Sequence, residues 1–239
     1  MSLKPSKFRD NKKLEEEMKS KRRSFEEKSK LPPPTLIISE GIKTEKHYMQ
    51  GLVDLIIERY SEINKNARHS MKDQIKVHGT GRNTIGLLKW ARKFAEQPEN
   101  KHYSRIWIMY DKDDFPLDNF DNTQFSIEDK ECDDTGRKFF AAWSNECFEL
   151  WFVLHFRELT SNVGRERYNE ILKSYFDYDK AATDIYDIIG KHEKSNIDLA
   201  ITRAKKLYKS YDDKTPSKMV PATRVYELVE ELRRYLSDD

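Results

Sequence analysis

Short apolar runs rich in β-forming residues alternate along this chain with stretches of helical periodicity. The runs are "TLIISEG", "DQIKVHG", "RIWIMYD" and the weaker "KFFAAWS". Strands that alternate with helices at this spacing are typical of right-handed βαβ units, in which helices cover a parallel sheet. The pattern therefore predicts an α/β fold with a mainly parallel sheet of about four strands.

Helical patterns follow the strands and fill the last third of the chain. After the first strand, apolar residues recur at helical spacing at Tyr48, Leu52, Leu55 and Ile56. Further helices are predicted at "NTIGLLKWARKFAEQ", "NECFELWFVLHF", "YDKAATDIYDIIG", "SNIDLAITRAKKLYKSY", with an N-cap at Ser195, and "TRVYELVEELRRYL".

Three regions differ in composition. Residues 4–30 hold 11 Lys or Arg against 6 Asp or Glu, a net charge of +5. We interpret 1–34 as a basic arm that ends in a stiff "LPPP" linker. The arm either attracts phosphate backbones or is a solvated tail without a partner. Residues 35–160 are expected to form the α/β core, and 161–239 a helical extension packed on it.

Composition limits the location of the protein. No stretch approaches the roughly 18 apolar residues that cross a bilayer, and "MSLKPSKFRD" lacks the apolar segment of a signal peptide. Cys132 and Cys147 cannot form a zinc quartet and are expected to be reduced thiols. These observations predict a cytoplasmic protein that does not bind a membrane.

Carboxylates gather where two predicted strands end. Glu40 follows "TLIIS", and Asp111, Asp113 and Asp114 follow "RIWIMY". In an open parallel sheet the functional residues collect at the carboxyl ends of the strands, so neighbouring strands would bring all four to one edge. Oxygen ligands of this kind are typical of Mg²⁺ or Mn²⁺ sites.

Five segments together carry a family resemblance. "LIISEGIKTEKHYMQGL" resembles the first motif of the Toprim fold, and "IWIMYDKDDF" resembles its second. With "GTGRNTIGLLKWA", "AWSNECFELWFVLHF" and "PATRVYELVEEL" in the same order, the chain resembles the RloB-like family over roughly residues 35 to 234. This bacterial family is often encoded beside restriction or phage-defence ATPases.

The resemblance implies a phosphoryl-transfer site. Glu40 would be the general acid or base, Asp111 and Asp113 would hold Mg²⁺, and Asp114 is an additional carboxylate that either ligates or is solvated. We find no assignable topoisomerase tyrosine and no zinc module, so simple hydrolysis is favoured. The implied function is a nuclease in phage defence that cleaves DNA or RNA, with an AAA- or ABC-type ATPase as a partner.

A glycine-rich turn could bind phosphate beside this site. "HGTGRNT" opens a helix, where backbone N–H groups are offered to an anion, and it contributes Gly79, Gly81 and Arg82. Gly41, next to Glu40, belongs to the same predicted phosphate-binding group. The turn lacks the Gly-Lys-Ser/Thr of a P-loop, so an ordinary strand-to-helix turn is the alternative.

Two further glutamates are candidates. Glu45 either caps the helix that follows Glu40 or joins the site. Glu149 lies among apolar residues of a helix predicted to start near Asn145, and needs a partner there, either a structural salt bridge or the metal site. His155 in the same helix is expected to be a hydrogen-bonded packing residue.

Other functions fit parts of the pattern. A haloacid-dehalogenase-type phosphatase also uses Asp-x-Asp after a strand, but it leaves Glu40 without a role, and a sugar-nucleotide transferase fits less well. A non-catalytic Toprim-like adaptor that binds a partner ATPase or nucleic acid is the main alternative. The aspartates could also belong to a solvated, salt-bridged loop.

Overall fold

A five-stranded sheet forms the centre of the unit that begins at Pro33 in a computed structural model, which describes residues 16, 18–19, 31–63, 67–113, 116–128 and 133–236. The spatial order is β2-β1-β3-β4-β5; the first four strands are parallel and β5 is antiparallel. The predicted α/β class is confirmed, and the short fifth strand is additional. The strands are β1 (Thr35–Ser39), β2 (Ile75–Gly79), β3 (Arg105–Asp111), β4 (Lys138–Asn145) and β5 (Ala222–Thr223).

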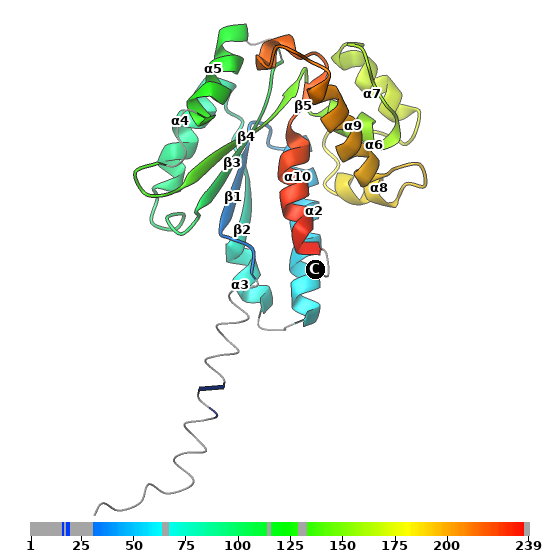
Figure 1. The fold of residues 1–239 in the computed structure, drawn as a ribbon. Helices are drawn as coiled ribbons and strands as arrows, with labels where there is room; N and C mark the ends of the chain where they lie inside the picture. Colours follow the sequence, from blue (N-terminus) through cyan, green and yellow to red (C-terminus); the bar gives the residue numbers. More distant parts are fainter. Residues whose placement is uncertain are drawn as a thin grey trace, which may run out of the picture. The chain divides into compact units, whose positions relative to one another are not determined.

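Helices cover both faces of this sheet (Figure 1). α4 and α5 lie on one face, whereas α2 and α10 lie on the other, and α6 to α9 form the helical region beyond them. The helices are α2 (Thr44–Ile63), α3 (Ala67–Gln74), α4 (Thr84–Ala95), α5 (Leu117–Glu128), α6 (Glu149–Phe156), α7 (Arg165–Lys173), α8 (Ile185–Lys191), α9 (Ile197–Lys209) and α10 (Val225–Arg233), with 3-10 turns η1 (Pro216–Lys218) and η2 (Arg234–Leu236).

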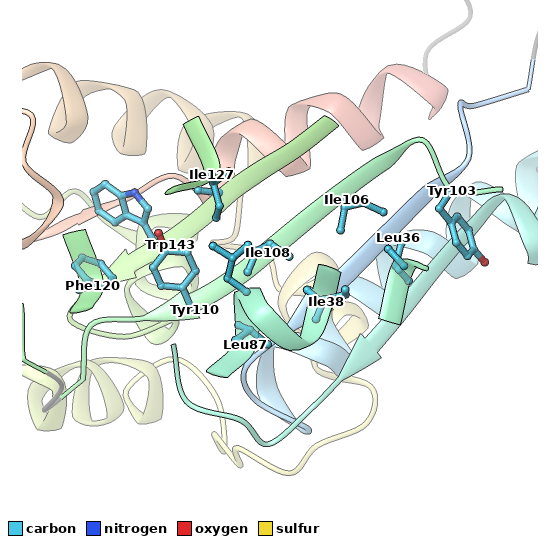
Figure 2. Packing of buried hydrophobic residues seen from close by; sticks show 14 of the residues in the cluster. Leu36, Ile38, Leu87, Tyr103, Ile106, Ile108, Tyr110, Phe120, Ile127 and Trp143 are labelled. Carbon is cyan, nitrogen blue, oxygen red and sulfur yellow. The ribbon is translucent and has the colours of Figure 1, made fainter. Parts of the chain in front are cut away.

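Alternate residues of the central strands form the core under α4 and α5. Leu36 and Ile38 of β1 lie beside Ile106 and Ile108 of β3 in register, and all four are fully buried. Figure 2 shows these side chains meeting residues from α4, α5 and β4. Each large apolar side chain buried in this way contributes roughly 1.5–3 kcal/mol. The helix residues shown there are Leu87, Phe120 and Ile127.

The amphipathic pattern of α10 is confirmed. Val225, Leu228, Val229 and Leu232 are all fully buried on one face. The helix is also tied to the sheet by charge, because Nε of Arg105 in β3 donates to Glu231 at 2.7 Å. The late part of the chain therefore completes one face of the core.

Two helix starts differ from their predicted positions. α6 begins at Glu149, because Ser144 and Asn145 continue β4 and pair with β5. α9 is capped by Asn196, whose side chain accepts from the N–H of Leu199, instead of by Ser195. Both differences arise from tertiary contacts that the local pattern does not contain.

Three smaller predictions have different outcomes. Leu55 was expected on the buried face of α2 but is 41% exposed, while Tyr48, Leu52 and Ile56 are fully buried as predicted. Most of the predicted arm, and Cys132, lie outside the described residues, whereas the "LPPP" linker at 31–34 is described. Among the helices that the structure describes, none is long and apolar enough to cross a membrane.

Candidate functional site

The carboxyl ends of β1 and β3 lie side by side. β1 pairs in parallel with β3, and the N–H of Glu40 donates to the carbonyl of Met109 at 2.9 Å. Glu40 therefore leaves β1 next to the last residues of β3, two positions before Asp111. The two strands are therefore neighbours in the sheet, which is the condition that a shared edge for their terminal carboxylates requires.

Asp111 is the last residue of β3 and is partly buried. Its Oδ2 accepts a hydrogen bond from the N–H of Phe148 at 3.0 Å. Its pKa lies well above the usual range, first because of burial and then because of the negative charges of Glu45, Asp113 and Glu149. The amide of Phe148 opposes this shift but does not cancel it. Asp111 is thus the centre of a group of mutually repelling carboxylates.

Glu45 reaches this group from the first turn of α2. Its carboxylate lies over Gly41, where an added Cβ would be only 2.0 Å from Glu45 Oε2. Burial raises the pKa of Glu45, the backbone N–H groups of Glu45 and Gly41 lower it, and the charges of Glu149 and Asp113 raise it again. Gly41 is therefore required for the close approach of Glu45 to the strand end.

Asp113 lies just beyond β3 with a φ of 39°, a left-handed conformation in which Asp is tolerated. Its N–H donates to the carbonyl of Glu146 at 3.1 Å, which ties the segment to the turn before α6. Its carboxylate pairs with Arg165 of α7 at 2.9 Å. Asp114, the third predicted aspartate, lies outside the described residues.

Glu149 opens α6 and has a side chain that is only 5% exposed. Lys180 lies 2.7 Å from its Oε1, and the hydroxyl of Tyr178 donates to the same oxygen at 3.0 Å. Burial opposes ionisation, but the hydrogen bond and charge of Lys180 outweigh it and lower the pKa of Glu149. Glu149 thus has the structural salt bridge that we expected, and it also contributes to the field at Asp111.

The glycine-rich turn lies beside Glu40. The N–H groups of Thr80 and Gly81 donate to the carbonyls of Ser39 and Glu40 at 3.0 and 2.8 Å. An added Cβ on Gly79 would lie 2.7 Å from the carbonyl of Gly41, so this residue also permits a close approach.

The same turn adopts the conformation that only glycine adopts freely. Gly81 has a φ of +66°. Arg82 follows on the surface, with its guanidinium 5.5 Å from the centre of the Trp90 ring. The residues predicted to bind phosphate therefore lie close together: Gly41, Gly79, Gly81 and Arg82. The guanidinium of Arg82, however, lies over the ring of Trp90.

The described carboxylates do not form a ready-made metal cage. Among the residues that the structure describes, no group of three or more His, Cys, Asp or Glu side chains is arranged to hold a metal ion. Two of the four carboxylates, Asp113 and Glu149, instead have cationic partners, Arg165 and Lys180. These two cations were not predicted, because they come from parts of the chain far from the acidic motifs and carry no local signal.

Comparison with known proteins identifies the family. The model of the RloB-like protein family matches residues 35–232. The chain belongs to the RloB-like family. Beyond this family model, no protein of curated function and no solved structure matches the chain. The family assignment agrees with the resemblance that the sequence motifs carry.

Proposed function

We propose that this RloB-like protein is a metal-dependent phosphoryl-transfer enzyme, a nuclease that cleaves nucleic-acid phosphodiesters. The observation that carries the proposal is the carboxylate group around Asp111. The raised pKa of Asp111 means that the protein opposes the ionisation of this residue, and the charges of Glu45, Asp113 and Glu149 each add to the repulsion. A bound divalent cation is the partner that would relieve this repulsion.

The donor chemistry fits Mg²⁺ or Mn²⁺. The candidate ligands are the oxygens of Asp111 and Asp113, with Asp114 as a further candidate from the sequence, and hard divalent cations prefer oxygen. When bound, such a cation polarises a phosphoryl oxygen and stabilises charge on the attacking or leaving group. Glu40, at the end of the neighbouring strand, would move the proton as general acid or base.

Cationic side chains near the carboxylates support a phosphate substrate. Arg165 lies 2.9 Å from Asp113 and is 41% exposed, so its guanidinium is accessible at this edge of the sheet. Arginine binds phosphate oxygens in a bidentate manner. We propose that Arg165, with Gly41, Gly79, Gly81 and Arg82, helps to position the scissile phosphate.

The biological setting extends the proposal through the resemblance alone. It includes a role in phage defence, a location in the cytoplasm and an AAA- or ABC-type ATPase as partner. Cleavage assays should therefore be run with and without such a partner, on both DNA and RNA.

The test is a Mn²⁺ titration by calorimetry followed by a cleavage screen, with wild type, Glu40→Gln and Asp111→Asn. We expect saturable Mn²⁺ binding that is lost in Asp111→Asn, and cleavage reduced by about a thousandfold, since metal catalysis contributes several kcal/mol. Asp54→Asn, an exposed position on α2, is the matched control. Cleavage that continues unchanged in Asp111→Asn would remove this site from consideration.

A second candidate is a non-catalytic adaptor that binds a partner ATPase or nucleic acid. It is favoured by the ion pairs of Asp113 with Arg165 and of Glu149 with Lys180, which already neutralise two of the carboxylates. Partner binding that survives Asp111→Asn, with no cleavage in wild type on any substrate, would select it.

A further inference from the structure

The outer edge of the sheet carries an aromatic stack. β2 is an edge strand, and its Lys76 and His78 pair in register with Leu36 and Ile38, which face α4. At this edge α4 contributes Trp90 and Phe94, which are only partly buried. The two aromatic residues are one helical turn apart and therefore share a face of α4.

The rings lie in close, nearly parallel contact. Trp90 and Phe94 have centroids 4.4 Å apart and an interplanar angle of 17°. His78 stacks on Trp90 at 5.2 Å and 18°, and lies 4.7 Å from Phe94. The result is a continuous aromatic surface at the rim of the molecule rather than inside its core.

Cations surround this surface. The guanidinium of Arg82 lies over Trp90 at 5.5 Å from the ring centre, and the ammonium of Lys76 lies over Phe94 at 5.3 Å. Burial lowers the pKa of His78, and the charges of Lys76 and Lys46 lower it further, which reflects the local excess of positive charge. We call Lys76, His78, Arg82, Trp90 and Phe94 the β2–α4 strip.

Two more cations extend the positive field on α4. Lys89 and Lys93 are exposed and lie on the turns that carry Trp90 and Phe94. α4 has no acidic residue in its first turn, so the positive N-terminal end of this helix carries no carboxylate of its own.

The strip is continuous with the acidic edge. Arg82 follows Gly81, whose N–H donates to the carbonyl of Glu40 at 2.8 Å. One end of the strip therefore lies at the residue that follows β1, and the other runs back along β2 and α4 (Figure 1).

We propose that the β2–α4 strip binds single-stranded nucleic acid and guides the strand toward Glu40 and Asp111. The inference rests on the proposed nuclease function, because it names the form of the substrate. Aromatic surfaces bordered by Lys and Arg are the usual means of holding unpaired bases and their phosphates, and stacking tolerates any base sequence. A duplex cannot use the strip, since its bases are already stacked on one another.

Arg82 has a specific part in this model. It covers an aromatic ring that a base would otherwise contact, and it is exposed. Stacking of a base on an aromatic ring is stronger than a cation–π contact at an exposed site. On binding, a base takes the place of the guanidinium over Trp90, and the released Arg82 pairs with the adjacent phosphate.

The competing explanation is that the stack only covers an edge strand, which proteins protect against pairing with other chains. That explanation predicts a loss of stability when Trp90 is changed, and no effect on nucleic-acid binding. The two explanations therefore differ in a measurable way.

The test measures binding of labelled 12-nucleotide oligo-dT and oligo-U by fluorescence anisotropy, with a 12-base-pair duplex for comparison, in the Asp111→Asn background to prevent cleavage. We expect the single strands to bind more tightly than the duplex. Trp90→Leu should weaken single-strand binding on the order of tenfold, Trp90→Phe should restore most of it, and Arg82→Ala should weaken it without loss of thermal stability.

Charge reversal has a matched control. Lys89→Glu with Lys93→Glu should weaken binding and make its salt dependence shallower by about one to two units of slope. Lys173→Glu with Lys209→Glu changes the net charge equally at exposed positions in the last turns of α7 and α9, and should have little effect. Equal losses in both pairs would mean non-specific attraction and would overturn the proposal.

Tryptophan fluorescence gives an independent measurement. The chain has 4 tryptophans, of which Trp107, Trp143 and Trp151 are at most 3% exposed. A base stacking on Trp90 should quench the emission, and Trp90→Phe should abolish that quenching. Unchanged emission on binding would overturn the proposal.

The outcomes separate this inference from the proposed function. Strip-dependent binding without cleavage in wild type would leave the inference standing and reject the nuclease. Cleavage whose kcat/KM is the same in wild type and Trp90→Leu would reject the inference and leave the nuclease standing.

Discussion

Two buried polar groups lie six residues apart on α6 and have opposite surroundings, one charged and one neutral. At the start of the helix, Glu149 belongs to the acidic group with Glu45, Asp111 and Asp113. Near its end, His155 is fully satisfied by neutral hydroxyl partners, with Nε2 at 3.1 Å from Tyr48 and Nδ1 at 3.2 Å from the Ser195 hydroxyl. A neutral imidazole has one donor and one acceptor, and each hydroxyl can supply the complement.

The two regions differ in how the fold shifts the pKa of a buried group. Burial lowers the pKa of His155 to about 3, helped by the charges of Arg203 and Arg233, so the ring stays neutral. Burial and like charges raise the pKa of Asp111, so the fold opposes its charged form. Arg165 and Lys180 offset the repulsion at Asp113 and Glu149, whereas at Asp111 the repulsion opposes ionisation. Groups with perturbed pKa values tend to cluster where a ligand or reaction requires them.

The largest expected effect concerns His155. His155→Ala removes a buried ring that contacts Tyr48 and Trp151. It also leaves the buried hydroxyl of Tyr48 and the partly buried hydroxyl of Ser195 with one partner fewer. We expect a loss of about 3–5 kcal/mol in the free energy of unfolding at pH 7, by analogy with other buried aromatic truncations. Urea denaturation measures it, and His102→Ala, at an exposed histidine, is the control.

The pH dependence sharpens this prediction. The folded state keeps His155 neutral, whereas the unfolded chain binds a proton below about pH 6.5, so wild type loses stability as the pH falls from 6.5 toward 3. At pH 5 the loss from this group is about 2 kcal/mol. The gap between wild type and His155→Ala should shrink by that amount between pH 7 and pH 5. A constant gap would mean that His155 is protonated in the folded state.

At Asp111 the pH dependence of stability should have the opposite sign to that at His155. A raised folded pKa at Asp111 means that stability falls as the pH rises from about 4, where the unfolded carboxyl ionises, to the folded pKa. Asp111→Asn keeps an acceptor for the N–H of Phe148 and removes the charge, so we expect a gain in the free energy of unfolding at pH 7 in EDTA. Asp54→Asn should stay within about 0.5 kcal/mol of wild type. A destabilised Asp111→Asn would contradict the repulsion on which the proposed metal site depends.

The smallest expected effect is at Ser195. Ser195→Ala removes one hydrogen bond to His155 and should cost about 1 kcal/mol. The double-mutant cycle of Ser195→Ala with His155→Ala measures the coupling directly. Additive losses would show that the hydroxyl does not stabilise the ring.

The sequence predicted the parallel sheet because β1, β3 and β4 are continuous apolar runs, which carry their own signal. It also placed Glu40 and Asp111 at the carboxyl ends of two strands, which meet at one edge only if the strands are neighbours. The pairing of β1 with β3 meets that condition. It could not identify Arg165 or Lys180 as partners of Asp113 and Glu149, because ion pairs across more than 30 positions leave no periodic trace.

The same limit explains the helix ends. The predicted start of α6 failed because the pairing of Ser144 and Asn145 with β5 depends on residues almost 80 positions later. At α9, Asn196 and Ser195 are both good capping residues, and the choice between them is made by the contact of Ser195 with His155.

β5 and α10 reach the sheet from far along the chain. The Ser144 and Thr223 hydroxyls meet across 79 positions, and Arg105 meets Glu231 across 126. On the ribosome β1, β3 and β4 emerge well before residues 222–233, so the apolar face that α10 will cover is exposed during synthesis. Contacts of this range close slowly, and uncovered apolar surface favours aggregation. Production of this protein should therefore depend on chaperones and on how soon residues 222–233 follow β4 from the ribosome.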